Sequence, residues 1–152
     1  FSGGRFDSIA FSQSLNGGRT WSTPIKVNRT PTNLPAGNQQ AFTATVHVSA
    51  NGTVGVSYYD FRNNTPAPAT LQTDFFLVHC HPTTPTACTS RANWGNEVRV
   101  TNTSFNMRQA PNAGGFFTGD YEGLDNIGTT FTPFFSQPHG TDPSSTFFRR
   151  VG

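Results

Sequence analysis

Lysine, methionine and charged residues in general are scarce in this chain of 152 residues. Only 12% of the residues are charged, there is one Met, and Lys26 is the single lysine. The formal net charge of +2 comes from separated arginines that form no basic run, so we expect no nucleic-acid partner. No apolar stretch approaches the ~18 residues that a membrane helix needs, so we also expect no membrane span.

The residues that are abundant favour short strands joined by many turns. The chain has 15 Phe, 15 Gly and 11 Pro residues, and Thr, Asn, Ser and Val are frequent while strong helix formers are few. Its length suits one domain with a core of its own. We therefore predict an all-β fold.

Only two cysteines occur, Cys80 and Cys88, on either side of the Pro/Thr-rich segment HPTTPTA. A disulfide would close this loop and implies an oxidising compartment outside the cell, whereas two free thiols are the alternative. A zinc site built from these cysteines with His79 and His81 is chemically conceivable. Neighbouring strand residues point to opposite faces, however, so we predict no metal site and no cofactor.

One hairpin is clear from the pattern of apolar residues. Residues 42–50 alternate between apolar and polar side chains, Asn51-Gly52 predicts a two-residue type I′ turn, and residues 53–60 form the returning strand. Residues 73–80 are apolar on both faces, which is typical of a strand buried between two layers.

An internal repeat connects the two tryptophans. WSTPIKV (residues 21–27) and WGNEVRV (residues 94–100) share their Trp, two β-branched residues and a basic residue at an offset of 73 positions. The same offset, without gaps, aligns Gly52 with Asp125 and so predicts a second hairpin turn at residues 124–126. The strands predicted in this way are residues 6–13 and 25–28; 42–50, 53–60, 73–80 and 97–101; and 116–122, 127–135 and 145–151.

Four-stranded antiparallel units that repeat along a chain are typical of the blades of a β-propeller. We predict a single partial propeller domain over residues 1–152, with a blade end (1–28), a full blade (42–101) and an incomplete last blade (116–152). Each tryptophan is expected to pack between neighbouring sheets. Two similar halves of a β-sandwich are the alternative.

SLNGGRTW (residues 14–21) resembles the Asp-box, or BNR repeat, of sialidase-like propellers, whose pattern is Ser/Thr, any, Asp, any, Gly, any, Thr, Trp. Asn16 stands where Asp is usual and keeps the oxygen that caps the turn. In the second copy little besides Trp94 remains of the pattern. The matching residues of the first copy are Ser14, Gly18, Thr20 and Trp21.

Residues 49–62 and 116–124 also resemble secreted bacterial proteins of the exo-sialidase type. The resemblance implies a six-bladed ring, of which this chain supplies about two and a quarter blades as the C-terminal portion. Upstream sequence or other chains would supply the remaining blades. It also implies a secreted protein, either an exo-glycosidase acting on glycans or a non-catalytic module that binds glycans or proteins or serves in surface assembly.

Propeller topology gathers the long connections on one face, where we expect any ligand. These connections are residues 29–41, 61–72, 102–115 and 136–144. The resemblance implies arginines that clamp a substrate carboxylate, a Tyr nucleophile assisted by Glu, and an Asp general acid.

The ligand-binding candidates are Arg62, Arg108 and Tyr59, and the catalytic candidates are Asp60, Arg62 and Asp120. We expect Asp120 to lie on a strand opposite His47. The alternative for Asp60 and Arg62 is that they only hold their own loop in place. Tyr121 and Glu122 are neighbours on a predicted strand and would face opposite ways, so they are not expected to touch.

Overall fold

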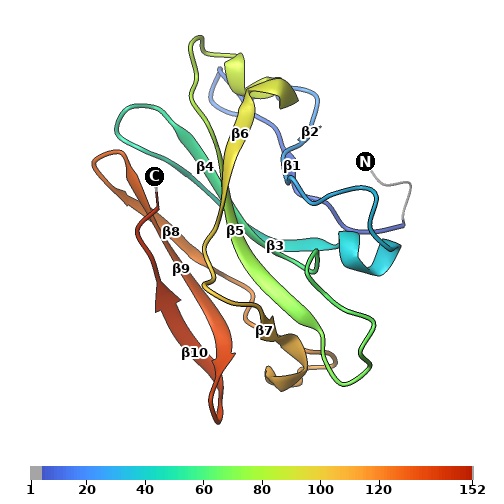
Figure 1. The fold of residues 1–152 in the computed structure, drawn as a ribbon. Helices are drawn as coiled ribbons and strands as arrows, with labels where there is room; N and C mark the ends of the chain where they lie inside the picture. Colours follow the sequence, from blue (N-terminus) through green and yellow to red (C-terminus); the bar gives the residue numbers. More distant parts are fainter. Residues whose placement is uncertain (1–4, 152) are drawn as a thin grey trace.

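The computed structural model describes residues 5–151 and shows an all-β chain (Figure 1). Residues 1–4 and 152 of the predicted domain lie outside the described residues. The helical elements in the described part are short 3-10 turns: η1 (Ala36–Gln39), η2 (Ala87–Thr89), η3 (Arg91–Asn93) and η4 (Met107–Gln109). Within residues 5–151, no helix is long and apolar enough to cross a membrane.

The strands form three antiparallel sheets in chain order. The first sheet pairs β1 with β2, the central sheet has the order β3-β4-β5-β6 with β7 added to β5, and the third has the order β8-β9-β10. No sheet of the described residues closes on itself. The bounds are β1 Ala10–Phe11, β2 Ile25–Lys26, β3 Ala41–Val48, β4 Val54–Asp60, β5 Gln72–Cys80, β6 Trp94–Arg99, β7 Phe105–Asn106, β8 Gly123–Ile127, β9 Thr130–His139 and β10 Asp142–Phe148.

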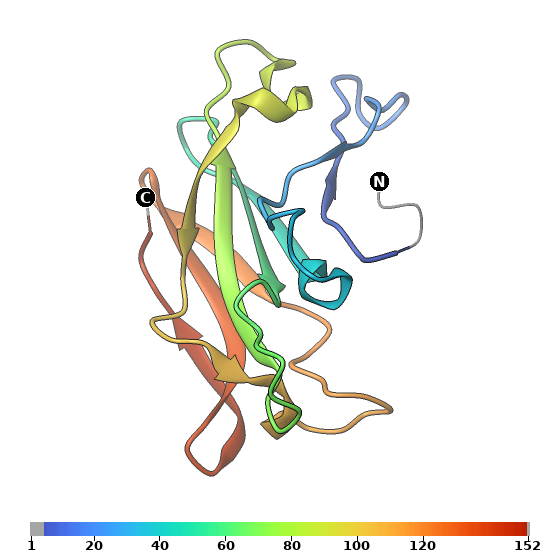
Figure 2. The same ribbon diagram turned by 45° about the vertical axis from the view of Figure 1, so that its right-hand side comes forward.

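The three sheets lie one beside the next, with the central sheet between the other two (Figure 2). β4 and β5 are buried along almost their whole length because both of their faces are covered. The prediction that residues 73–80 form a strand buried between layers is therefore confirmed.

Two hydrophobic cores occupy the two faces of the central sheet. The first core lies on the side of the first sheet and includes Ile9, Val27, Val56, Tyr58, Phe76, Val78 and Trp94. The second lies on the side of the third sheet and includes Tyr59, Phe75, Leu77, Val100, Phe105, Phe131 and Phe135. Consecutive residues such as Tyr58 and Tyr59 thus enter different cores, as the period of a strand requires.

The connections gather at two ends of the sheets. In Figure 1 the β1–β2, β3–β4, β5–β6 and β8–β9 connections lie toward the upper end, and the β4–β5 loop, η4 and the β9–β10 turn lie toward the lower end. We call these the turn side and the long-loop side.

The predicted β3–β4 hairpin is present, but its turn is not the two-residue type I′ turn. Gly52 alone in the turn has a positive φ (85°), and its N–H donates to the carbonyl of Ser49. The Asn51 side chain accepts a hydrogen bond from the backbone N–H of Thr53. Asn51 therefore stabilises the turn through its amide oxygen and does not adopt the left-handed conformation that type I′ requires.

The predicted strand bounds of the third sheet are wrong by several residues. Residues 124–126 lie inside β8 instead of forming a turn, and the turn lies at Gly128-Thr129. The ungapped offset of 73 failed here because the loop before β8 is longer than the corresponding loop before β3. The expected long connection at residues 136–144 is also wrong, because β9 and β10 meet in a tight turn at Gly140 (φ 60°).

The two tryptophans have opposite environments. Trp94 is 1% exposed and packs on Phe11 in the first core, with 4.9 Å between ring centroids. Trp21 is 65% exposed, so the prediction that it packs between sheets is wrong within the described residues. Its indole N–H donates to the carbonyl of Gly18 in its own turn (3.1 Å).

Candidate functional site

The turn between β1 and β2 is held by the side chains of the predicted Asp-box. The Ser14 hydroxyl oxygen accepts from the backbone N–H of Gly18 (2.8 Å), and the Asn16 amide oxygen accepts from the backbone N–H of Thr20 (2.9 Å). The Asn16 amide N–H donates to the Thr20 hydroxyl (2.9 Å). Asparagine thus caps this turn without the charge of aspartate.

The corresponding connection of the central sheet is held by a disulfide. Cys80 and Cys88 are bonded with an S–S distance of 2.08 Å, in agreement with the predicted pairing. The carbonyl of Cys88 accepts the indole N–H of Trp94 (2.8 Å). The disulfide loop therefore fixes the tryptophan that fills the first core.

Asp60 and Arg62, both candidates from the sequence, bind each other inside the first core. Arg62 Nε donates to Asp60 Oδ2 (2.6 Å), and its two Nη atoms donate to Glu97 (2.5 and 3.0 Å). The guanidinium also lies 3.6 Å from the ring centroid of Phe76. The Tyr58 hydroxyl donates to Glu97. In this geometry Arg62 is engaged by side chains of its own chain.

Burial and ion pairing oppose each other in this cluster. Burial disfavours the charge on Arg62, but hydrogen bonds to Glu97 and the nearby charge of Asp60 outweigh it and raise the pKa of Arg62. Burial also raises the pKa of Asp60, while Arg62 and the Thr30 hydroxyl act in the opposite direction. The pKa of Tyr58 is raised by burial and by Glu97. The cluster is a structural unit in which two carboxylates share one cation.

A second carboxylate, Asp74 on β5, is fully buried and fully engaged. Its Oδ1 accepts from Arg99 Nε (2.8 Å) and the Thr101 hydroxyl (2.8 Å), and its Oδ2 accepts from Asn63 (2.8 Å) and Ser104 (2.8 Å). Sequence reasoning missed this residue because its partners come from two separate stretches of chain, residue 63 and residues 99–104.

Tyr59, a predicted ligand-binding residue, has no exposed surface and contacts Glu122 in the second core. Its hydroxyl lies 2.8 Å from Glu122 Oε1 and 2.6 Å from the Ser136 carbonyl. The backbone N–H of Ser136 faces both the Tyr59 hydroxyl (3.1 Å) and Glu122 Oε2 (3.2 Å). No arginine, lysine or histidine of the described residues forms an ion pair with Glu122.

Burial without a cation raises the pKa of Glu122 to about 7, against weaker opposing effects of Tyr59 and Ser136. The hydrogen-bond geometry explains why a protonated carboxyl fits. One Tyr59 proton cannot serve both Glu122 and the Ser136 carbonyl, whereas a protonated Glu122 can donate to Tyr59 while Tyr59 donates to Ser136. Glu122 is therefore the described carboxyl group best suited to exchange a proton near neutral pH.

Asp120 does not lie where it was predicted. It is exposed in the segment before β8, and His47 Nε2 instead contacts Asn126 Oδ1 (2.6 Å) and lies 3.6 Å from Asp125. The register error in the third sheet explains the difference. Tyr121 is 92% exposed and separate from Tyr59, so the tyrosine that meets Glu122 is not its sequence neighbour.

A pocket of about 360 Å³ opens on the long-loop side. Aromatic and aliphatic side chains form most of its wall, and two polar residues, Asp7 and Gln40, also line it. Arg108 stands beside it, with its guanidinium carbon 5.4 Å from the Phe116 ring centroid. The apolar lining residues are Phe42, Phe61, Leu71, Met107 and Phe116.

The pocket and the Tyr59–Glu122 pair are neighbours. Phe42, which lines the pocket, stacks on Tyr59 with 5.5 Å between ring centroids, and it also packs on Phe61 at 5.0 Å. One aromatic ring thus separates the pocket from the buried pair. Of the sequence candidates, Arg108 lies at the pocket and Tyr59 directly behind it, whereas Arg62 and Asp60 belong to the opposite core.

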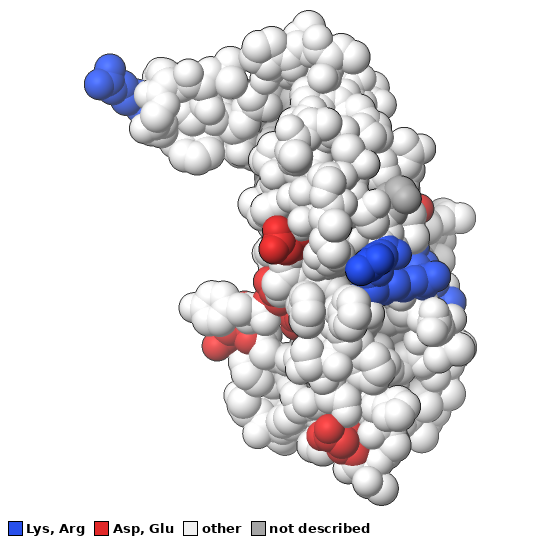
Figure 3. All heavy atoms as spheres, turned by 90° about the vertical axis from the view of Figure 1, so that its left-hand side faces the viewer, with Lys and Arg blue, Asp and Glu red and all other residues white. Residues whose placement is uncertain are grey.

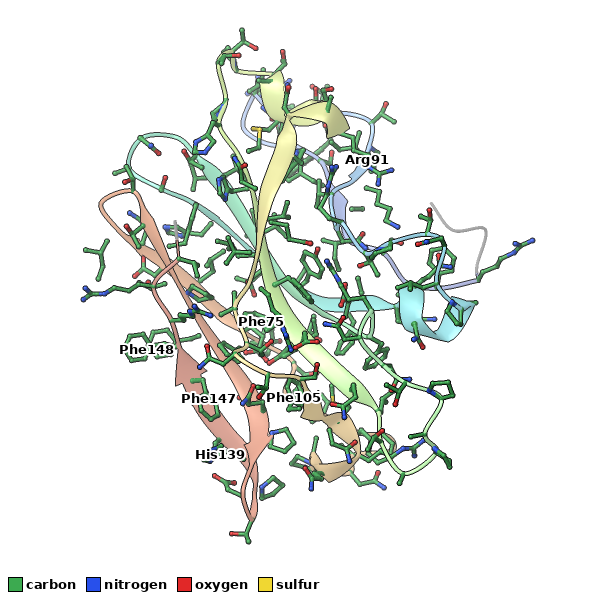
Figure 4. All side chains as sticks on the ribbon, viewed as in Figure 1. Phe75, Arg91, Phe105, His139, Phe147 and Phe148 are labelled. Atoms are coloured by element: carbon green, nitrogen blue, oxygen red, sulfur yellow. A yellow bond between two sulfur atoms is a disulfide. The ribbon has the colours of Figure 1, made fainter. Side chains whose placement is uncertain are left out.

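Charged side chains are sparse on the face shown in Figure 3, where the red and blue groups are separated by large uncharged areas. Figure 4 shows Phe75 and Phe105 between the central and third sheets, and Phe148 on the outer side of β10. Within residues 5–151, no group of three or more His, Cys, Asp or Glu side chains could hold a metal ion.

No family model matches the chain, and no match was found among curated proteins or solved structures. The resemblance to sialidase-like propellers therefore rests on the quoted residues of the chain itself.

Sequence reasoning missed Glu97 because a bulge reverses the alternation of β6. Asn96 has a φ of 50°, and the pairing of β5 with β6 shifts register in the same region. Trp94 therefore packs in the first core and Val98 against the second, while Glu97 turns toward Arg62. Asn at a strand position was the available signal, since Asn tolerates a left-handed backbone better than most residues.

Proposed function

We propose that this chain is part of a secreted β-propeller of the sialidase-like, Asp-box kind, and that its long-loop side binds a glycan. The three stacked antiparallel sheets, the hydrogen-bonded Asp-box turn and the disulfide support the proposal. The first and third sheets would then be neighbours of further blades, which agrees with the exposure of Trp21 on the first sheet.

The observation that carries the binding proposal is the aromatic pocket on the long-loop side. Sugar rings have apolar faces that pack on aromatic side chains, and their hydroxyls need a few polar partners at the edge. Phe61 and Phe116 supply aromatic surface, Asp7 and Gln40 supply polar groups, and Arg108 supplies a cation for an acidic sugar.

Calorimetric titration with a panel of neutral and sialylated oligosaccharides tests this proposal. We expect Phe116→Ala to weaken binding at least tenfold, and Arg108→Gln to remove any preference for sialylated ligands. Phe148→Ala is the matched control, since Phe148 is also exposed but lies on β10, away from the pocket. Absence of binding to the whole panel, or equal losses in the Phe116 and Phe148 variants, would contradict the proposal.

Hydrolysis by an exo-glycosidase of the sialidase type is a second candidate function, favoured by the Tyr59–Glu122 contact. A tyrosine assisted by a glutamate is what the resemblance implies, but Tyr59 is fully buried behind Phe42, and burial together with Glu122 raises its pKa. The part that this contact would supply is therefore proton transfer by Glu122, whose pKa of about 7 suits neutral pH. Turnover of fluorogenic sialosides that is lost in Glu122→Gln, with glycan binding retained, is the expected result for this candidate. Glycan binding without turnover of any glycoside in a panel would contradict hydrolysis and favour the non-catalytic module.

A further inference from the structure

Two histidines meet at the end of β5 on the turn side, away from the long-loop pocket. His79 and His81 are two residues apart, so an extended backbone directs both side chains to the same side of the sheet. Their ring centroids are 4.7 Å apart and the ring planes are inclined by 81°. The four-ligand zinc site considered from the sequence is excluded, because Cys80 and Cys88 are joined in a disulfide.

Each ring has a nitrogen without a protein partner. His79 is 9% exposed, and its Nδ1 is buried with no hydrogen-bond partner. His81 is held through Nδ1, which lies 3.0 Å from the Thr53 hydroxyl, and its Nε2 has no hydrogen bond to another described residue. Buried ring nitrogens are normally paired, and no described protein group occupies Nδ1 of His79, so this nitrogen is available to a ligand.

A pocket of about 220 Å³ adjoins the pair, between the β3–β4 turn and the β8–β9 turn. A water molecule takes about 30 Å³ of liquid volume, so the pocket has room for an ion and several waters. Imidazoles that share a metal at ~2.0–2.1 Å from each nitrogen have ring centroids about 5 Å apart at a tetrahedral angle. The remaining lining residues are Asn51, Thr53, Thr129 and Phe131.

We propose that His79 and His81 bind one borderline transition-metal ion, such as Zn²⁺, Ni²⁺ or Cu²⁺, with water completing the coordination. Imidazole is a preferred ligand of these ions, and the Thr53 hydroxyl orients the His81 ring as an outer partner. Burial, together with the neighbouring His81, lowers the pKa of His79, which keeps its ring in the neutral form that ligates metals. This site is independent of the proposed glycan binding.

Titration calorimetry of the protein with NiCl₂ and CuCl₂ tests the site. We expect one ion per chain, and we expect His81→Gln and His79→Gln each to weaken binding at least about tenfold. His47→Gln and His139→Gln are the controls and should leave affinity within about twofold of the wild type. Binding should also weaken as the pH falls, because protons compete with the metal for the imidazole nitrogens. The Cu²⁺ complex should show coupling to two nitrogens by electron paramagnetic resonance.

His81 is exposed, so His81→Gln decides the test even where the buried His79→Gln variant fails to fold. Absence of binding up to about 1 mM metal would overturn the proposal. An unchanged affinity in His81→Gln, or an equal loss in His47→Gln, would do so as well, because either result places the ion elsewhere.

Discussion

The two faces of the central sheet bury neighbouring tyrosines, each against a glutamate, but in opposite electrical surroundings. On the first face Tyr58 and Glu97 are joined by Arg62, which forms an ion pair with the carboxylate. On the second face Tyr59 and Glu122 have no cation among the described residues, and the pKa of Glu122 rises to about 7. A tyrosine–glutamate contact is thus part of an ion-paired cluster on one face and a titratable contact on the other.

This difference indicates separate roles for the two faces. The ion-paired cluster holds the first and central sheets together and leaves no group of the cluster free for a ligand. The uncompensated pair sits one ring behind the pocket, since Phe42 lies between Tyr59 and the pocket. Chemistry that depends on pH is therefore expected on the second face.

The largest effect is expected from removing the cation of the first face. Arg62→Met leaves the buried Asp60 and the half-buried Glu97 without their shared cation, and breaking a buried pair in this way costs about 3–5 kcal/mol in unfolding free energy. Urea denaturation measures it. Arg150→Met is the control, because Arg150 is exposed and has no ion pair with a described residue. A loss under ~1 kcal/mol for Arg62→Met would mean that the cluster is not a stabilising unit.

A smaller and pH-dependent effect is expected on the second face. The folded-state pKa of Glu122 is raised from 4.5 to about 7, so its protonated form is favoured by folding. That contribution is present below pH ~4.5 and is lost as the pH rises through ~7. As the pH rises from ~4.5 to ~7, the unfolding free energy of Glu122→Gln should therefore increase by about 2–3 kcal/mol relative to that of the wild type. Urea denaturation of both proteins at several pH values checks this. If the difference in unfolding free energy between the variant and the wild type did not change with pH, Glu122 would not have the raised pKa that burial without a cation produces.

The smallest effect is expected at the exposed tryptophan of the β1–β2 turn. Trp21→Ala removes one hydrogen bond to the Gly18 carbonyl and little buried surface, so we expect a loss under ~1 kcal/mol. The buried Trp94 gives the contrasting result, because Trp94→Ala leaves a cavity in the first core and should cost about 3–5 kcal/mol. Equal losses at the two positions in thermal denaturation would show that Trp21 is covered in solution.

The features that sequence reasoning predicted correctly depend on short stretches of chain. The β3–β4 hairpin, the buried strand β5, the Asn16 hydrogen bond in the β1–β2 turn and the Cys80–Cys88 pair each involve residues close in sequence. Local spacing and turn chemistry are sufficient for such features.

The features that were missed depend on loop lengths and on contacts between sheets. An alignment of the repeat without gaps cannot account for the longer loop before β8, so Asp120 was wrongly placed opposite His47. The Tyr59–Glu122 contact joins residues 63 positions apart, and nothing in either local sequence marks it. The pocket combines side chains from residues 7 to 116, which only the stacking of the sheets brings together.

Glycan binding on the long-loop side is the central claim, and an amide NMR titration of the protein with a sialylated oligosaccharide tests it most directly. Binding in the pocket predicts shift changes that concentrate at Phe42, Phe61 and Phe116, with the turn side unchanged. Shift changes confined to the turn side, or no changes at millimolar ligand, would contradict it.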